Sequence, residues 1–139
     1  MELETGGAFQ GKLDYAVKKY ALLESEICEC SEDADPDFSA VCLTHYERYV
    51  MRCLREGTAP KTSFGGTYCC VDGVCGYTGG EGGHGPLVII MDDIFCGVVP
   101  ADSELRAWRE LCGRTLTALA QNAEEVTRLF CGIPKTIKP

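Results

Sequence analysis

The stretch Glu4-Thr-Gly-Gly-Ala-Phe-Gln-Gly-Lys12 has the G-x-x-x-x-G-K spacing of a loop that binds phosphate groups. Its adjacent glycines let consecutive backbone N–H groups turn toward one anion, and Lys12 supplies a positive charge. The stretch overlaps a short strand pattern, Met1 to Thr5, and precedes a helical pattern from Lys12 to Leu22. Leu13 stands where such loops carry the Ser or Thr that binds Mg²⁺. The sequence therefore favours nucleotide binding over ordinary metal-assisted catalysis.

A second clear signature is the apolar run Leu87 to Met91, which ends in Asp92 and Asp93. A continuous apolar run of this length is typical of a parallel strand that is covered on both faces. Periodicity predicts the other elements, which are strands at Ile27 to Cys30 and Glu125 to Cys131 and helices from about Phe38 to Arg55 and from about Asp102 to Ala123. Alternating strands and helices predict an α/β fold with a sheet.

The composition is that of a globular domain, with 139 residues, of which 45% are hydrophobic and 24% are charged. We expect one domain over residues 1–139. A formal net charge of −8 without clustered basic residues argues against a nucleic-acid partner. No apolar run approaches the roughly 20 residues needed to span a bilayer, and no signal-peptide pattern is present, so we expect no membrane partner and a cytoplasmic location. The ten cysteines are accordingly expected to be reduced thiols.

Residues 57–86 form a Gly- and Cys-rich segment, which we interpret as a long mobile loop of the same domain. Thiols and an imidazole in or near it are alternative zinc ligands, namely Cys69, Cys70, Cys75, His84 and Cys96. Structural zinc sites usually contain paired C-x-x-C motifs, and this spacing is irregular. A segment that covers a bound ligand, or a disordered one, is therefore favoured over a zinc site.

The phosphate loop and the two aspartates are expected to lie together. In an α/β sheet, ligands bind outside the carboxyl ends of the strands, and both features follow the end of a strand. Residues 6–12 would then share one crevice with Asp92 and Asp93. An aspartate there would orient Mg²⁺ through water, or accept the proton of an attacking hydroxyl, and either role assists phosphoryl transfer.

Two segments resemble the bifunctional adenosylcobinamide kinase and adenosylcobinamide-phosphate guanylyltransferase family of cobalamin assembly. Thr5-Gly-Gly-Ala-Phe-Gln-Gly-Lys12 is similar to the family's opening T-G-G-A-x-S-G-K-S. Leu87-Val-Ile-Ile-Met-Asp-Asp-Ile-Phe-Cys-Gly-Val-Val-Pro100 is similar to its L-V-x-x-N-E-V-G-x-G-I-V-P. The likeness continues without a gap through the helix with Arg106, Arg109 and Arg114 to Lys138. Together the two segments cover about half of the chain.

The resemblance implies a P-loop NTPase-like fold with a mostly parallel sheet and helices on both faces. It implies phosphorylation of adenosylcobinamide with ATP or GTP, then transfer of GMP to that phosphate through a guanylylated histidine, and a homo-oligomer. The nucleotide would lie against the loop residues Gly6, Gly7, Ala8, Phe9, Gln10, Gly11, Lys12 and Leu13. Asp92 and Asp93, at the family's Asn and Glu positions, would be the Mg²⁺ ligands, and Lys12, Asp93 and His45 the catalytic residues.

The chain departs from the family pattern at several points. Leu13 replaces the loop serine, Phe95 replaces a glycine, and Leu116 and Thr117 stand where the family commonly has Asn-Gln. His45 is the candidate for the guanylyl-carrying histidine, although it falls inside the predicted helix and the histidine segment is short.

Two further hypotheses therefore remain beside the corrinoid-modifying enzyme. The first is a non-catalytic relative that binds a nucleotide or a corrinoid, which Leu13 suggests. The second is a metal-binding or thiol module based on the cysteines.

Overall fold

The central element is a six-stranded sheet. The computed structural model describes residues 1–64, 67–71, 74–78 and 85–139, the two short middle stretches as backbone only. Strand order in the sheet is β2-β3-β6-β1-β7-β8, and all neighbours are parallel except β7 and β8. The strands are β1 (Glu2–Gly6), β2 (Ile27–Glu29), β3 (Cys42–Thr44), β6 (Val88–Asp92), β7 (Glu125–Phe130) and β8 (Ile133–Lys138). The predicted α/β fold with a mostly parallel sheet is confirmed.

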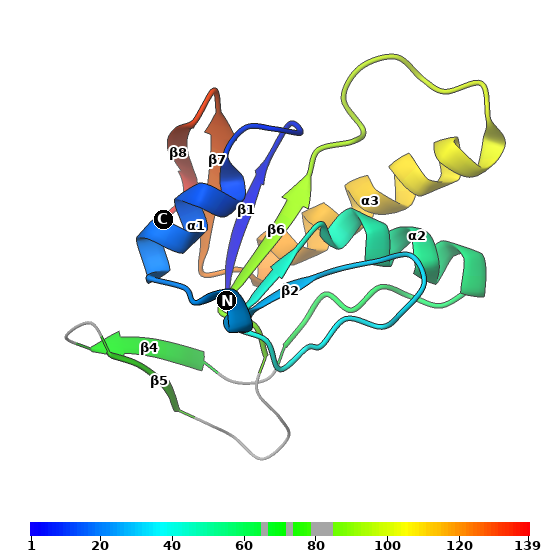
Figure 1. Ribbon diagram of the computed structural model, residues 1–139. Coiled ribbons are helices and arrows are strands. Elements are labelled where there is room, and N and C mark those ends of the chain that lie inside the picture. Colours follow the sequence, from blue (N-terminus) through cyan, green and yellow to red (C-terminus); the bar gives the residue numbers. More distant parts are fainter. Residues whose placement is uncertain (65–66, 72–73, 79–84) are drawn as a thin grey trace.

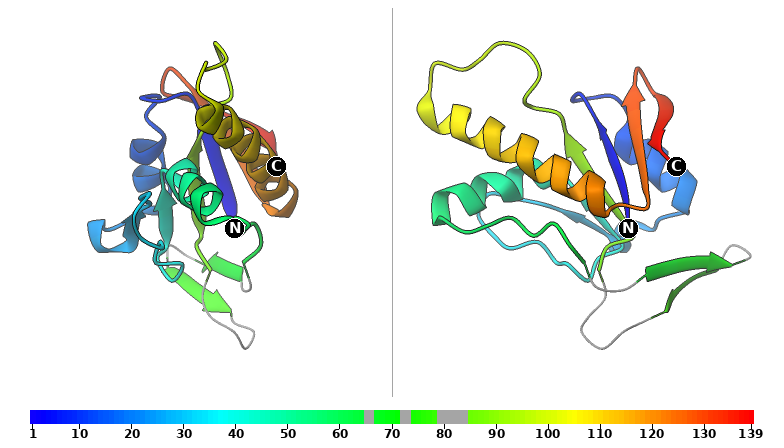
Figure 2. Two further views of the ribbon diagram at one scale, coloured as in Figure 1. Left: turned by 90° about the vertical axis from the view of Figure 1, so that its right-hand side faces the viewer. Right: turned by 180° about the vertical axis from the view of Figure 1, so that it is seen from behind.

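Helices cover both faces of this sheet, as expected (Figure 1). Helix α1 (Lys12–Tyr20) lies on one face, and α2 (Tyr46–Glu56) and α3 (Ser103–Asn122) lie on the other (Figure 2). Strand β6 has apolar side chains on both faces of the sheet, because its side chains alternate between two cores, and helices must bury both sets. Val88 and Ile90 pack in the α1 core, whereas Ile89 and Met91 pack in the α2–α3 core.

Strand β1 lies at the centre, between β6 and β7. After β1 the chain forms β2, β3 and β6, which all lie on one side of β1. It then crosses through α3 to β7, which lies on the other side of β1. Ligands of α/β sheets bind at such a reversal of direction, outside the carboxyl ends of the strands. The fold therefore positions a site where β1 and β6 end. Among the described residues, no helix has the length and apolar character to cross a lipid bilayer.

The helix predicted from about Phe38 to Arg55 is wrong in its first part. Residues Cys42–Thr44 form β3, the short 3-10 turn η1 (Glu24–Glu26) precedes β2, and α2 begins only at Tyr46. Cys42 pairs with Val88, and Leu43 pairs with Ile89. Pairing with β2 and β6 therefore decides the conformation of this segment against the helix that the spacing of Leu43 predicts. Leu43 still packs in the core, but from a strand.

The Gly- and Cys-rich segment contains structure that the sequence did not predict. β4 (Thr67–Val71) and β5 (Val74–Thr78) pair antiparallel in a separate two-stranded sheet, with Cys70 opposite Cys75 in register. The side chains of Cys69, Cys70 and Cys75, and all of His84, lie outside the described residues, so the zinc alternative stays a prediction there.

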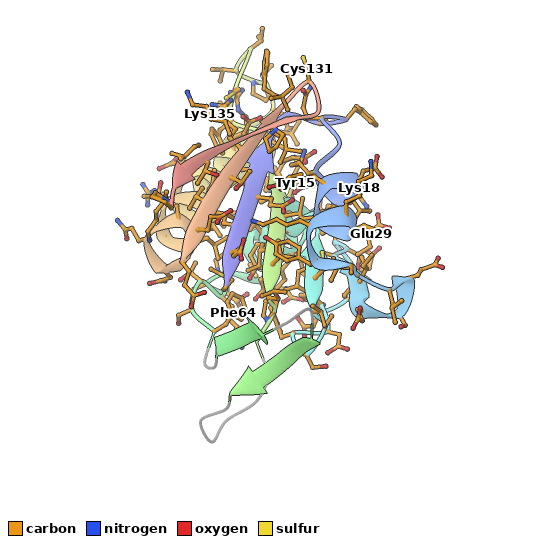
Figure 3. All side chains as sticks on the ribbon, turned by 90° about the vertical axis from the view of Figure 1, so that its left-hand side faces the viewer. Tyr15, Lys18, Glu29, Phe64, Cys131 and Lys135 are labelled. Carbon is orange, nitrogen blue, oxygen red and sulfur yellow. The ribbon has the colours of Figure 1, made fainter. Side chains whose placement is uncertain are left out.

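The end of the chain adds another strand. The strand predicted from Glu125 to Cys131 is β7, and it ends one residue earlier, at Phe130. Cys131 and Gly132 both have positive φ, 51° and 75°, and form the turn into β8. A two-residue turn with two positive φ values matches the twist of an antiparallel hairpin. Figure 3 shows Cys131 at this turn, at the end of the sheet where the phosphate loop also lies.

Candidate functional site

The phosphate loop begins at a glycine that no other residue can replace without strain. Gly6 ends β1 with a φ of 143°, and a Cβ built on it would lie 2.4 Å from the backbone oxygen of Leu129 in β7. The close approach of β1 and β7 at this point therefore requires glycine. At the other end of the loop, Gly11 has a φ of 76° and precedes the first turn of α1.

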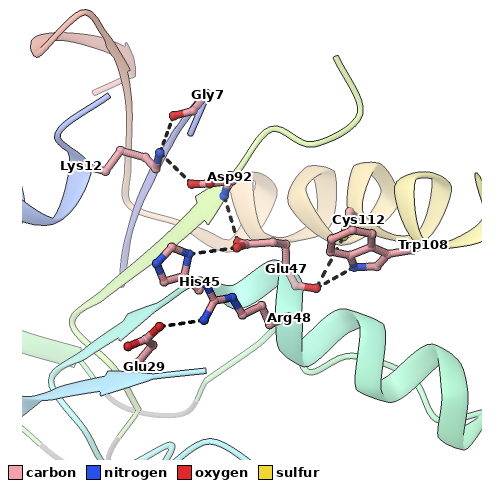
Figure 4. Close-up of polar contacts among 9 residues, drawn as sticks. All are labelled: Gly7, Lys12, Glu29, His45, Glu47, Arg48, Asp92, Trp108 and Cys112. Carbon is pink, nitrogen blue, oxygen red and sulfur yellow. Dashed lines mark hydrogen bonds and ion pairs between the residues drawn. The ribbon is translucent and has the colours of Figure 1, made fainter. Parts of the chain in front are cut away.

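Lys12 joins the loop to strand β6. Only 6% of its surface is exposed, although it lies in the first turn of α1. Its Nζ atom donates a hydrogen bond of 2.7 Å to the backbone oxygen of Gly7 and lies 2.7 Å from Oδ1 of Asp92 (Figure 4). The structure thus brings the loop and Asp92 together, as expected from the shared edge of the sheet.

His45 lies at the same edge, in a conformation that the sequence did not indicate. It is the residue before α2, with φ 55° and ψ 45°, rather than a residue inside a helix. A positive φ is uncommon for a residue with a side chain, and such conformations cluster at functional sites. The turn places His45 next to Lys12 and Asp92 around one cavity. The expectation that it falls inside a helix is wrong.

Glu47 is a site residue that sequence analysis missed. Its side chain is buried, with 5% of its surface exposed, and it contacts two neighbours through different oxygens. Oε1 lies 3.1 Å from Nδ1 of His45, and Oε2 accepts a hydrogen bond of 3.1 Å from the backbone N–H of Asp92 (Figure 4). A glutamate two residues beyond a histidine, within an otherwise apolar helix face, is the only signal that the sequence offered.

Contacts with α3 hold this part of α2 in position. The backbone oxygen of Glu47 accepts a 2.7 Å hydrogen bond from Nε1 of Trp108, and Sγ of Cys112 lies 4.0 Å from the same oxygen. Arg48 forms an ion pair of 2.7 Å with Glu29 at the end of β2. The α2 amino terminus is therefore tied to two other elements, which fixes where His45 and Glu47 lie.

These residues surround a cavity of about 470 Å³, which we call the loop cavity. The phosphate loop and the start of α1 form one wall, and the β3–α2 junction and the end of β6 form the other. The wall residues are Ala8, Phe9, Gln10, Gly11, Lys12, Leu13, Asp14, Thr44, His45, Glu47, Arg48, Ile90 and Asp92. One ligand atom from each of His45, Glu47 and Asp92 falls within 4.8 Å of the others, which is close enough for one metal ion.

Asp93 does not line this cavity. Its Oδ2 atom pairs with Nη2 of Arg128 at 2.8 Å, and its backbone N–H donates to the oxygen of Gly6 at 3.0 Å. Its side chain lines a second cavity, between α3 and the sheet. The two aspartates predicted to bind one Mg²⁺ ion therefore face different cavities, because consecutive residues at a strand end point to opposite faces.

Leu13, Phe9 and Gln10 differ in exposure and in their contacts. Leu13 is 38% exposed on the wall of the loop cavity and offers no oxygen there. Phe9 has a φ of 59° and a fully exposed ring. The Oε1 atom of Gln10 accepts a hydrogen bond from the backbone N–H of Cys131, which joins the loop to the β7–β8 turn.

A buried carboxyl group lies in β1, three residues before Gly7. Glu4 is 1% exposed, and its two carboxyl oxygens have no hydrogen-bond partner within the described parts of the chain. Burial raises the pKa of Glu4 to about 8, since an ionised carboxylate loses its hydration there. Glu4 is therefore largely protonated at neutral pH, and it adds little negative charge beneath the phosphate loop.

Residues 80–137 match the family model described as cobinamide kinase / cobinamide phosphate guanyltransferase. The chain is similar to that family over this segment, which is less than half of its length. The match spans β6, α3, β7 and most of β8, so the resemblance seen from Leu87 onward is confirmed. It supports a role in the modification of cobinamide during cobalamin biosynthesis.

The other half of the site lies outside the family match. The phosphate loop, Lys12, His45 and Glu47 all precede residue 80, whereas Asp92 and Asp93 fall within the match. No curated protein matches the chain at a significant level. The nucleotide-binding interpretation of the first half therefore depends on loop spacing, strand order and the contacts of Lys12.

Proposed function

We propose that this protein is a nucleotide-dependent transferase that phosphorylates adenosylcobinamide, or a related corrinoid, and transfers GMP to the product. The family match supports the corrinoid substrate. The observation that supports nucleotide binding is the position of Lys12, whose ammonium group lies between the phosphate loop and Asp92 on the wall of the loop cavity.

The loop cavity suits the phosphate groups of ATP or GTP. Residues at the start of α1 line it, and a helix amino terminus carries a partial positive charge that attracts anions. Lys12 adds a full charge, and its present partners are a carbonyl oxygen and a carboxylate oxygen. A triphosphate would replace the Gly7 contact with a stronger, charged one.

A divalent cation fits beside the phosphates. Asp92 and Glu47 provide carboxylate oxygens, which are the ligands that Mg²⁺ prefers, and they lie close enough to each other to share one ion. Bound there, Mg²⁺ would neutralise charge on the transferring phosphate. Leu13 provides no ligand, so Glu47 takes the place of the usual loop hydroxyl in this proposal.

His45 is the proposed carrier of GMP. Its Nδ1 atom faces the carboxylate of Glu47, so a proton on Nδ1 leaves a free electron pair on Nε2. Nε2 would attack the α-phosphorus of GTP, a P–N bond would form, and the bond to the β-phosphate oxygen would break, which releases pyrophosphate. A phosphate oxygen of the corrinoid would then displace the histidine and restore its free electron pair.

Asp93 remains the predicted acceptor for the proton of the corrinoid hydroxyl. A Cβ built on Gly7 would lie 3.8 Å from Oδ1 of Asp93, so this carboxylate borders the loop at Gly7. Its carboxylate is paired with Arg128, and this pair would have to open before Asp93 accepts the proton.

The two reactions are tested separately. Incubation of the purified protein with adenosylcobinamide, Mg²⁺ and GTP labelled on the γ-phosphate should yield a labelled corrinoid. GTP labelled on the α-phosphate should instead label the protein itself, through an acid-labile bond to histidine. The variant His45→Ala should lose the second label and retain the first. Absence of both labels with Mg²⁺ and with Mn²⁺ would exclude catalysis.

A non-catalytic nucleotide-binding relative is the second candidate, and Leu13 favours it. The apolar side chain lies on the cavity wall in place of the metal-binding hydroxyl. Such a protein would show thermal stabilisation by GTP that Lys12→Ala abolishes, without turnover of any corrinoid.

A further inference from the structure

Arg128 lies beside the phosphate loop, although it belongs to the other end of the chain. In the pairing of β7 with β1, Arg128 stands opposite Thr5, the residue before Gly6. The backbone oxygen of the next residue, Leu129, is so close that a Cβ built on Gly6 would lie 2.4 Å from it. The end of β7 is therefore packed against the start of the loop.

The carboxylate of Asp93 connects Arg128 to this loop. Its Oδ2 atom lies 2.8 Å from Nη2 of Arg128. Its Oδ1 atom borders Gly7, where a Cβ would lie 3.8 Å from it. One carboxylate therefore contacts the guanidinium group with one oxygen and borders the loop with the other, so only this carboxylate separates Arg128 from the backbone at Gly7.

The guanidinium group of Arg128 has N–H donors beyond those that Asp93 uses. A guanidinium group carries five of them. Within the described ranges of the chain, its hydrogen bond to Asp93 is the only one that it makes. Half of the surface of the Arg128 side chain is exposed, and it lines the second cavity together with Asp93. An ion pair with this exposure is held weakly, so a phosphate group is able to replace the carboxylate.

The phosphate loop also needs a further positive charge. Leu13 offers no oxygen to a metal ion, and the ammonium group of Lys12 is already paired with Asp92. Phosphoryl transfer depends on cations that stabilise the charge of the transferring phosphate. A planar guanidinium group suits this task, because it donates to two phosphate oxygens at once.

We propose, on the basis of the proposed kinase reaction, that Arg128 leaves Asp93 during phosphoryl transfer and binds oxygens of the transferring γ-phosphate. The same movement frees Asp93 to accept the proton of the attacking hydroxyl. A bond forms between the hydroxyl oxygen and the γ-phosphorus, the bond from this phosphorus to the β–γ bridging oxygen breaks, and the nucleoside diphosphate leaves. Arg128 is then a catalytic residue, and its exchange of partners couples stabilisation of the phosphate to activation of the base.

The first test needs no corrinoid. Isothermal titration with Mg²⁺ compares binding of GDP alone with binding of GDP plus aluminium fluoride, which mimics the transferring phosphate. The full wild-type chain should bind GDP about 100-fold more tightly with aluminium fluoride, the lower end for a transition-state mimic. Arg128→Ala should lose this gain and keep its affinity for GDP alone. Lys135, an exposed residue opposite Arg128 in the β7–β8 pairing, provides the matched control Lys135→Ala, which should retain the gain.

The second test measures turnover. Single-turnover transfer of the γ-phosphate of GTP to adenosylcobinamide should slow by about 1,000-fold in Arg128→Ala, with the Kd for GTP nearly unchanged. Added guanidinium ion should restore part of this rate, which it would not do if Arg128 only supported the fold. Asp93→Asn should also slow the transfer, but it should retain the gain with aluminium fluoride, and guanidinium ion should not rescue it.

The outcomes separate this role of Arg128 from the proposed function. An equal gain with aluminium fluoride in the wild type and Arg128→Ala, or no gain in either, would overturn the role of Arg128 and leave nucleotide binding in place. An equal loss in Lys135→Ala would overturn it in favour of a general charge effect. A gain that depends on Arg128, without transfer to the corrinoid, would retain the role and refute the corrinoid substrate. Failure of the wild type to bind GDP and GTP would refute both, and thermal melts establish that each variant is folded.

Discussion

The Nδ1 atom of His45 lies 3.1 Å from Oε1 of Glu47, and the other carboxylate oxygen of Glu47 accepts the backbone N–H of Asp92. A single buried glutamate thus connects the β3–α2 junction to the end of β6. The pairing selects one tautomer of the imidazole and directs its second nitrogen away from Glu47. The arrangement leaves Nε2 of His45 available for its proposed role as the carrier of GMP.

Replacement of Glu47 should therefore slow the proposed reaction at His45 more than it lowers the stability of the fold. Glu47→Gln retains the size of the side chain and removes the charge that favours a proton on Nδ1. We expect labelling of His45 by α-labelled GTP to slow by about 100-fold, within the range for a lost acid–base contribution. Single-turnover labelling measures this rate. The surface change Glu56→Gln, at the other end of α2, is the matched control, and an unchanged rate in Glu47→Gln would remove the assigned role of this pair.

Lys12 should dominate nucleotide affinity. Lys12→Ala removes a charged hydrogen bond, worth about 1.5–3 kcal/mol, so the Kd for GTP should rise by about 10- to 150-fold. Isothermal titration at fixed salt provides the measurement. Lys18, on the same helix but exposed and labelled in Figure 3, offers the control Lys18→Ala. Equal losses in both variants would indicate a general charge effect rather than a phosphate contact.

Gly6 should be intolerant of a side chain, for steric reasons. Gly6→Ala places a Cβ 2.4 Å from the backbone oxygen of Leu129, so β1 and β7 must separate. We expect a loss of more than about 3 kcal/mol, measured by urea unfolding. Gly57→Ala is also at positive φ, 69°, but meets nothing within 4 Å, and it should cost only about 1 kcal/mol. Similar losses at both positions would show that φ, and not the β7 contact, limits Gly6.

Glu4 should make stability depend on pH. Its pKa is about 8 when folded and near 4.5 when unfolded, so the folded state holds the extra proton between these values. Stability from this group is complete below pH 4.5 and is lost as pH rises to 8, by up to about 4 kcal/mol. Glu4→Gln should flatten that decline in urea unfolding measured at pH 5, 6.5 and 8. The exposed control Glu24→Gln should retain the wild-type slope, and a steep decline in Glu4→Gln would refute the assignment.

Self-association should involve the exposed apolar side chains of the last two strands. Phe130, Ile133 and Ile137 are exposed apolar side chains on β7 and β8, with 71%, 68% and 58% of their surfaces exposed. Large exposed apolar patches mark interaction sites. Light scattering after gel filtration should show an oligomer, which Phe130→Asp converts to a smaller species. A monomeric wild type at micromolar concentration would contradict this expectation.

Local patterns were sufficient for the elements that bury a continuous or regularly spaced apolar face. The run before Asp92 became β6, the residues from Asp102 to Ala123 became α3 with its caps, and the glycine-rich loop joined β1 to α1. In these cases the hydrophobic period and the tertiary environment favour the same structure.

Local patterns failed where pairing across the sheet decided the conformation. Leu43 has helical spacing to the following apolar residues, but the gap beside β6 accepts only an extended segment, so Cys42–Thr44 became a strand. His45 then had to turn sharply before α2 could begin, which explains its positive φ. No pattern within the segment contains that information.

The amino-acid order alone determined the α/β alternation, the phosphate loop and the acidic end of β6, because each depends on neighbouring residues. Only the tertiary structure decided that Asp92 faces Lys12 while Asp93 faces Arg128, and that Glu47 lies between His45 and Asp92. These contacts join residues up to 80 positions apart in the chain, from Lys12 to Asp92, and strand order and side-chain direction bring them together.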